Sequence, residues 1–124
     1  MGSSDPPEEN VPQLGVEIFE REGAQIVALS GELDLRAAAE LQSALDQASA
    51  GEHARVCLDL SALQFIDSTG LAIVIRSHQD TIEAGGRLVV VCAAGNVRRT
   101  FETTGLMAML SVAETVDEAL QRLV

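Results

Sequence analysis

The stretch DSTG, residues 67–70, places an acid, two hydroxyls and a glycine between a strand-like run and a helix-like run. A serine nucleophile needs a base within hydrogen-bond reach, and the hydrolase elbow sets its serine between glycines as G-x-S-x-G. Ser68 instead follows an aspartate. The two histidines are His53, in a polar loop, and His78, on the apolar side of the following helix, so neither is placed as its base. The pattern does not favour a hydrolase.

Other catalytic classes also lack a necessary residue. An aspartic protease needs two carboxylates that share a proton, whereas one acid of this chain stands in a D-S-T-G context. The acids and histidines follow no metal-ligand spacing. All eight basic residues are arginine, which removes lysine Schiff-base chemistry and P-loop phosphate binding, and leaves a phospho-receiver domain without its late lysine. We expect no enzyme, no metal and no cofactor.

The length of the chain, 124 residues, fits one domain, and the composition indicates an acidic surface. A formal charge of −11 repels nucleic acid and anionic lipid, and it makes a basic protein surface the easiest partner. Cys57 and Cys92 each lie inside an apolar run without CxxC spacing, which predicts buried free thiols.

The N-terminal residues, MGSSDPPEENVPQ, are polar and acidic and contain no apolar segment. They match neither a signal peptide nor a membrane span. We therefore expect a disordered acidic tail at 1–13, a domain at 14–124, and a cytoplasmic protein without membrane insertion.

Alternation and periodicity predict elements in the order β-β-α-β-α-β-α-β-α. Two β-rich runs, 15–22 and 24–33, form an antiparallel hairpin in which Gly23 supplies a positive φ. The helix at 35–48 has Asp34 at its N-cap and a stripe of small and apolar residues at helical spacing. The remaining elements are a strand at 54–60, a helix from about 69 to 84, a strand at 87–94, a helix at 96–104 closed by Gly105, a short strand at 109–112, and a last helix capped by Thr115.

This order predicts an α/β fold: one domain with a mixed sheet of about five strands, an N-terminal hairpin followed by right-handed parallel crossovers, and about four helices. In such sheets partners meet the carboxyl ends of the parallel strands, where loops lead into helices. Residues 31–34 and 67–70 both lie at such ends. We expect them to be neighbours in space.

Two interpretations of residues 67–70 follow from the residues alone. In the first, Ser68 or Thr69 caps the helix, Gly70 permits close packing, and Asp67 adds a favourable charge. In the second, the helix presents a docking surface. At about 100° per residue, its outward side carries Thr69, Ile73, Arg76, Asp80 and Glu83, and its inward side carries Leu71, Val74, Ile75, His78 and Ile82.

The sequence resembles the STAS domain family, and within it the small single-domain anti-sigma factor antagonists. The resemblance covers residues 14 to 124. It rests on the order of the elements, on GELD at 31–34, and on LDLSALQFIDSTGLAIVI at 58–75, which is similar to the strand, D-S-[ST]-G loop and helix of the family.

The resemblance implies a switch. Ser68 would be phosphorylated by an anti-sigma factor that is itself a serine kinase, and a separate serine phosphatase would restore it. The unphosphorylated form would bind the anti-sigma factor and free a sigma factor for transcription. The implied partner surface consists of Asp34, Asp67, Ser68, Thr69, Gly70, Ile73 and Arg76. Domains that resemble this one also occur as non-switching subunits of lipid-transport complexes and of sensory assemblies, so that alternative stays open, as does a ligand-binding sensor.

Overall fold

The computed structural model describes residues 14–51 and 53–124. The tail expected at 1–13 lies outside them. The elements are β1 Leu14–Arg21, β2 Ala24–Leu33, the 3-10 turn η2 Leu35–Ala37, α1 Ala38–Ala48, β3 Arg55–Ile66, α2 Ser68–Glu83, β4 Arg87–Val91, α3 Asn96–Thr104, the 3-10 turn η3 Leu106–Met109, β5 Ser111–Ala113 and α4 Val116–Leu123. The predicted order and the predicted α/β class are confirmed.

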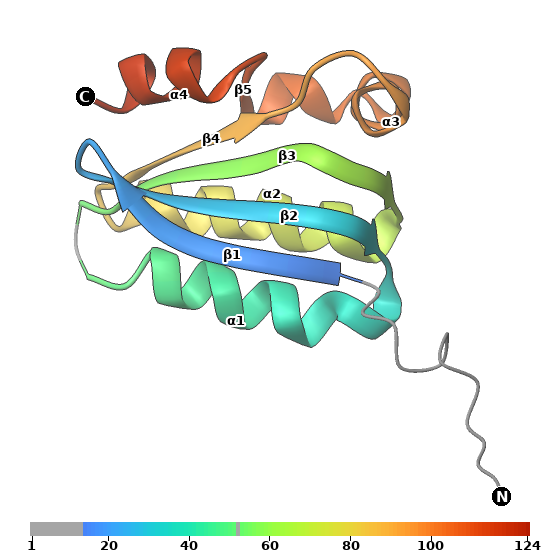
Figure 1. The fold of residues 1–124 in the computed structure, drawn as a ribbon, viewed down its shortest axis with the longest axis horizontal. Coiled ribbons are helices and arrows are strands. Elements are labelled where there is room, and N and C mark those ends of the chain that lie inside the picture. The colour runs from blue at the N-terminus through green and yellow to red at the C-terminus, as the bar shows by residue number, and fades with distance from the viewer. Residues whose placement is uncertain (1–13, 52) are drawn as a thin grey trace, which may run out of the picture.

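The five strands form one sheet in the order β1-β2-β3-β4-β5 (Figure 1). β1 and β2 are antiparallel, and every later pair is parallel. Glu22 and Gly23 both have positive φ, of 54° and 84°, so the hairpin turn has the twist that favours glycine at its second position. The mixed sheet follows from this hairpin and from the helical crossovers after it.

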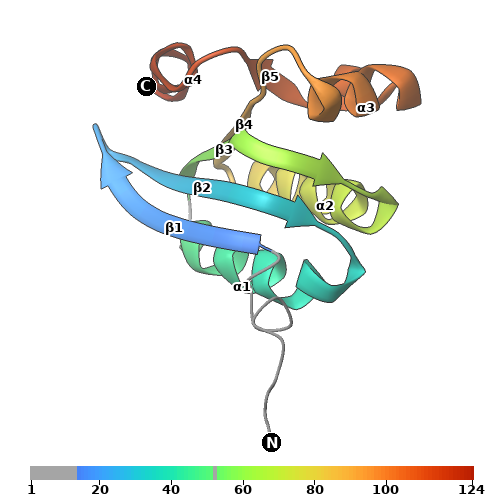
Figure 2. The same cartoon turned by 45° about the vertical axis from the view of Figure 1, so that its right-hand side comes forward.

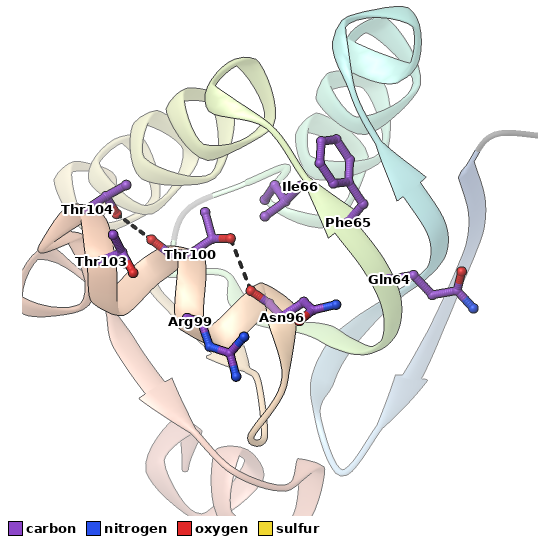
Figure 3. Close-up of a pocket in the computed structure, with 8 residues that line it drawn as sticks. All are labelled: Gln64, Phe65, Ile66, Asn96, Arg99, Thr100, Thr103 and Thr104. Carbon is purple, nitrogen blue, oxygen red and sulfur yellow. Dashed lines mark hydrogen bonds between the residues drawn. The ribbon is translucent and has the colours of Figure 1, made fainter.

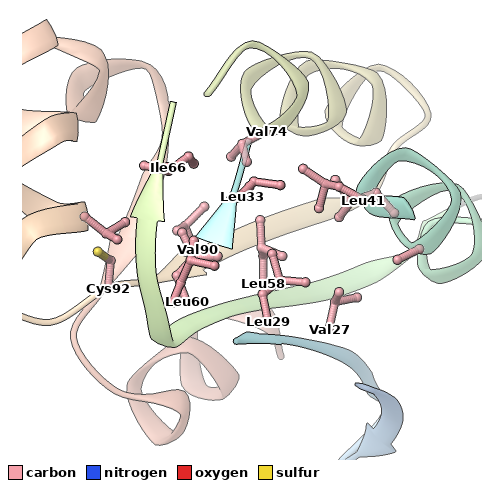
Figure 4. Packing of buried hydrophobic residues seen from close by; sticks show 14 of the residues in the cluster. Val27, Leu29, Leu33, Leu41, Leu58, Leu60, Ile66, Val74, Val90 and Cys92 are labelled. Atoms are coloured by element: carbon pink, nitrogen blue, oxygen red, sulfur yellow. The ribbon is translucent and has the colours of Figure 1, made fainter. Parts of the chain in front are cut away.

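Helices cover both faces of the sheet (Figure 2). On one face, α1 and α2 bury Leu41 and Val74 against the strands (Figure 4). Leu45 of α1 and Phe101 of α3, which packs beside β3, belong to the same cluster. On the other face, α4 buries an apolar stripe against the sheet in a smaller cluster. Because β4 is buried on both faces, its side chains form the continuous apolar run seen in the sequence.

Several boundaries differ from the prediction. β3 continues to Ile66, six residues beyond the predicted strand, because register shifts against β2 at 28/30 and 31/32 break the alternation that marks a strand. β4 ends at Val91, and β5 starts two residues late because residues 106–109 form a 3-10 turn.

Ile82, expected on the inward side of α2, is 51% exposed. Thr81 is buried there instead, with its hydroxyl donating to Ser77 O at 2.7 Å.

Both cysteines are buried free thiols, as predicted. Burial raises the pKa of Cys57 to about 12, and it also raises the pKa of Cys92. Because only the thiolate is nucleophilic, we expect neither residue to react with iodoacetamide at mildly alkaline pH in the folded protein, and both to react in denaturant. Mass spectrometry of the two samples measures this. Rapid alkylation of Cys57 in the native protein would contradict the packing of β3.

Candidate functional site

The loops after β2 and β3 lie side by side at the carboxyl edge of the sheet. Leu33 and Ile66, the last residues of the two strands, are paired, and the Asp67 N–H donates to Leu33 O at 3.1 Å. The prediction that 31–34 and 67–70 are neighbours is therefore confirmed. None of the described helices has the length and hydrophobicity to traverse a bilayer.

Asp67 is the N-cap of α2. Its backbone is extended, and its Oδ1 accepts a hydrogen bond from Gly70 N at 3.0 Å, which satisfies one of the free N–H groups of the first turn. The expectation that Ser68 or Thr69 is the cap is wrong. The reason is that a side-chain oxygen must come from the last non-helical residue, and the helix starts one residue earlier than the spacing indicated.

Ser68 is consequently left exposed as the first residue of α2. Among the described residues, its hydroxyl has no hydrogen-bond partner. His78 is buried further along α2, and His53 contacts Gly85 O at 3.1 Å, beside the C-terminus of α2. No histidine is therefore placed to activate Ser68. What this serine offers chemically is an accessible acceptor for a transferred group.

Gly70 is buried where α2 approaches the end of β2. A Cβ at this position would lie 2.7 Å from Leu33 Cγ and 3.0 Å from Ile66 Cγ1. Both distances are shorter than ordinary contacts between carbon atoms. A residue without a side chain is needed for the helix to begin so close to the sheet.

Asp34 holds the neighbouring loop. Its Oδ1 accepts from Arg36 N, and its Oδ2 accepts from the Arg36 guanidinium, each at 3.0 Å. The hydrogen bond from the Arg36 side chain lowers the pKa of Asp34, so this carboxylate is ionised at neutral pH. The predicted N-cap role is confirmed, although the turn that Asp34 starts is the 3-10 turn before α1.

The outward face of α2 differs in part from the prediction. Arg76 is exposed as expected, and Thr69 is half-buried. Ile73, expected to face outward, is also half-buried and packs against the main core. Ala72 takes the exposed place one turn after Ser68. The spacing of four residues from Ser68 could have identified Ala72, but an alanine carries no signal in a pattern based on polarity.

A groove of about 410 Å³ lies beside the DSTG loop, between the end of β3 and α3 (Figure 3). Phe65, with 50% of its surface exposed, and Ile66 contribute to it from the strand, and Arg99 and Thr100 contribute from the helix. Sequence analysis missed this groove. Because the register shifts before Phe65, the alternation of the sequence does not tell on which face of β3 this side chain lies. The packing of α3 beside β3 is a tertiary contact, which no local sequence pattern predicts.

A model of the STAS domain matches residues 16–119 of the chain. The chain belongs to the STAS domain family. Among relatives of this STAS domain, the anti-sigma F factor antagonist of Paenibacillus polymyxa is 29% identical over 111 residues, which make up 89% of this chain and 95% of the relative. The resemblance seen in GELD and in 58–75 is thus confirmed at the level of the family.

Solved structures agree with this assignment. The crystal structure of an anti-sigma factor antagonist from Mycobacterium paratuberculosis has a TM-score of 0.81 and 28% identity, covering 89% of this STAS domain chain and 93% of the other. The Bacillus cell fate determinant SpoIIAA in its phosphorylated form has a TM-score of 0.64 and 22% identity, covering 89% and 100% of the two chains. The second likeness shows the STAS fold alone.

Proposed function

We propose that this STAS domain is an anti-sigma factor antagonist whose partner binding is switched off by phosphorylation of Ser68. The observation that carries the proposal is an exposed serine hydroxyl at the first position of α2, beside the loop of Asp34, with no hydrogen bond to any residue that the structure describes. Relatives of similar length are named anti-sigma factor antagonists, and SpoIIAA, which has the same fold, is known in a phosphorylated form.

Three residues have separate roles in this proposal. Asp67 caps the helix, Gly70 keeps the helix close to β2, and Ser68 is left to receive phosphate. The partner is an anti-sigma factor serine kinase, which approaches the edge formed by the two loops and the exposed row Ser68, Ala72 and Arg76. A serine phosphatase removes the phosphate. This chain is then the substrate and the signal rather than the catalyst.

Phosphorylation acts on the interface and leaves the fold intact. A phosphoserine adds about −1.5 to −2 charges, and at a helix N-terminus this charge meets the positive end of the dipole, worth roughly 0.3–1 kcal/mol. The helix is not destabilised by that change. The dianion instead adds bulk and charge next to the carboxylate of Asp67, on a protein with a formal charge of −11. A tenfold loss of affinity requires only about 1.4 kcal/mol.

Affinity purification from the source cell, followed by mass spectrometry, tests the proposal. We expect a kinase-like anti-sigma factor to co-purify, and we expect phosphate on Ser68 in the fraction of the protein that is not bound to it. Co-purification with a membrane ATPase, together with an unmodified Ser68, would instead identify a non-switching subunit.

The exposed row on α2 gives a second prediction. Ala72→Arg places a long cation one turn from Ser68, so we expect the affinity for the anti-sigma factor to fall about tenfold while the melting temperature is unchanged. Ile73→Arg should lower the melting temperature as well, because it breaks the packing of Ile73 against the core. Calorimetric titration and thermal unfolding measure the two effects.

Gln79→Arg is the matched control, since Gln79 is exposed further along α2. It introduces the same charge at a greater distance from Ser68. Equal losses of affinity in Ala72→Arg and Gln79→Arg would mean that net charge, rather than the Ser68 end of α2, governs binding.

A further inference from the structure

A second cavity lies at the opposite end of α2 from Ser68. Its volume is about 360 Å³. It lies between α2, β4, β5 and α4, and the residues that line it include His78, Ile82, Arg87, Leu88, Ser111 and Arg122. β5 begins opposite Val89, so no strand of the described chain lies beside the first two residues of β4 on that edge. The cavity occupies this short edge of the sheet. The helices α2 and α4 cover opposite faces of the sheet (Figure 1).

His78 brings unused hydrogen-bonding capacity to this cavity. The residue is only 9% exposed, yet neither ring nitrogen has a hydrogen-bond partner within residues 14–51 and 53–124. Burial lowers the pKa of His78, so at neutral pH the ring is neutral and carries one N–H donor and one acceptor. A buried polar group without a partner is uncommon and costs free energy, which a ligand at this position would recover.

The charge in the cavity favours an anion. The Arg87 guanidinium donates to Arg122 O at 3.1 Å but forms no ion pair with any described carboxylate, whereas Arg122 is paired with Glu118 at 2.7 Å. No acidic residue of the described chain lines the cavity. In a protein with a formal charge of −11, an arginine that has no counter-ion among the described residues and lies beside an apolar wall is a selective place for a single negative charge.

We propose that this cavity binds a small monocarboxylate with a short apolar tail. The carboxylate accepts hydrogen bonds from the Arg87 guanidinium and from the His78 N–H, and the tail packs against Ile82 and Leu88. A phosphate would meet one unpaired guanidinium and would leave the apolar wall unused. The site lies at the far end of α2 from Ser68 and is independent of the function proposed above.

NMR titration of the full chain with hexanoate at constant ionic strength tests this proposal. We expect saturable shifts of the Leu88 and Ser111 amides and of the His78 ring, with the amide of Ala72, near the other end of α2, as an internal reference. Acetate, which lacks the tail, and hexanol, which lacks the charge, should each bind about tenfold more weakly. If hexanol bound as tightly as hexanoate, the site would be an apolar cleft without selectivity for charge. If inorganic phosphate bound as tightly as hexanoate, the site would be a general anion site. Either result, or the absence of saturation, overturns the proposal.

Two pairs of variants separate the roles of the residues. Arg87→Gln should weaken hexanoate binding about tenfold, while Arg99→Gln, which changes an exposed arginine beside the groove of α3, should leave it unchanged. His78→Phe keeps a ring in place but removes the donor, so hexanoate binding should fall. His78→Gln restores a donor and should recover part of the affinity. Tight hexanoate binding by both Arg87→Gln and His78→Phe would refute the assignment.

Discussion

If the proposed function holds, Ser68→Ala should accept no phosphate from the anti-sigma factor kinase and should bind that partner whether or not ATP is present. Ser68→Asp should bind about tenfold more weakly than the unmodified protein, because its carboxylate imitates part of the phosphate charge. Both variants should unfold at the temperature of the wild type, since the Ser68 hydroxyl is exposed and has no partner among the described residues. Transfer of labelled phosphate and calorimetric titration with the kinase measure the two effects.

Thr69→Ala is the matched control, because it removes the neighbouring hydroxyl and leaves Ser68 in place. We expect phosphate incorporation into Thr69→Ala to equal that of the wild type. If Ser68→Ala were still labelled, or if Thr69→Ala were not labelled, the modified residue would be Thr69. Either result would reject the proposed role of Ser68.

Gly70→Ala should destabilise the fold, although it adds a single methyl group. The new Cβ would lie 2.7 Å from Leu33 Cγ, and Leu33 is fully buried, so neither group has room to move. Overpacking of this kind costs roughly 1–3 kcal/mol in the free energy of unfolding. Urea denaturation at neutral pH measures the loss.

A double-mutant cycle identifies the cause of that loss. Leu33→Ala alone should cost roughly 2–5 kcal/mol because it opens a cavity in the core. In the Leu33→Ala background, Gly70→Ala should cost less than it does in the wild type, since the atom it collides with has been removed. Additive losses would show that the contact between Gly70 and Leu33 does not set the distance between the helix and the sheet.

The sequence predicted the fold well wherever a pattern was local. The hairpin at Glu22 and Gly23, the α4 cap at Thr115 and the helix end at Gly105 depend on neighbouring residues, and each is found where it was expected. Prediction of β3 and β5 was less accurate. The end of β3 depends on register shifts against β2, and the start of β5 depends on a 3-10 turn that has no periodic signal.

The site was predictable in its location but not in its details. Strand order alone placed residues 31–34 beside 67–70, because parallel strands end at one edge. The identity of the cap was not predictable, because Asp67, Ser68 and Thr69 are all suitable cap residues and the first turn of α2 decides among them. Exposure on α2 depends on neighbouring elements, so Ile73 is half-buried against the core and Ile82 is exposed, which an isolated helix does not indicate.

The hydrogen bond from Gly70 N to Asp67 has a genetic consequence. Since the first turn of α2 is held by Asp67, a mutation at codon 68 would yield a protein that still accumulates to normal levels in the cell. Under the proposed function, a Ser68→Ala allele would be dominant, because the altered protein would keep sequestering the kinase beside an intact copy. Alleles at codon 67 or 70 would instead be recessive, since they would reduce the amount of folded protein.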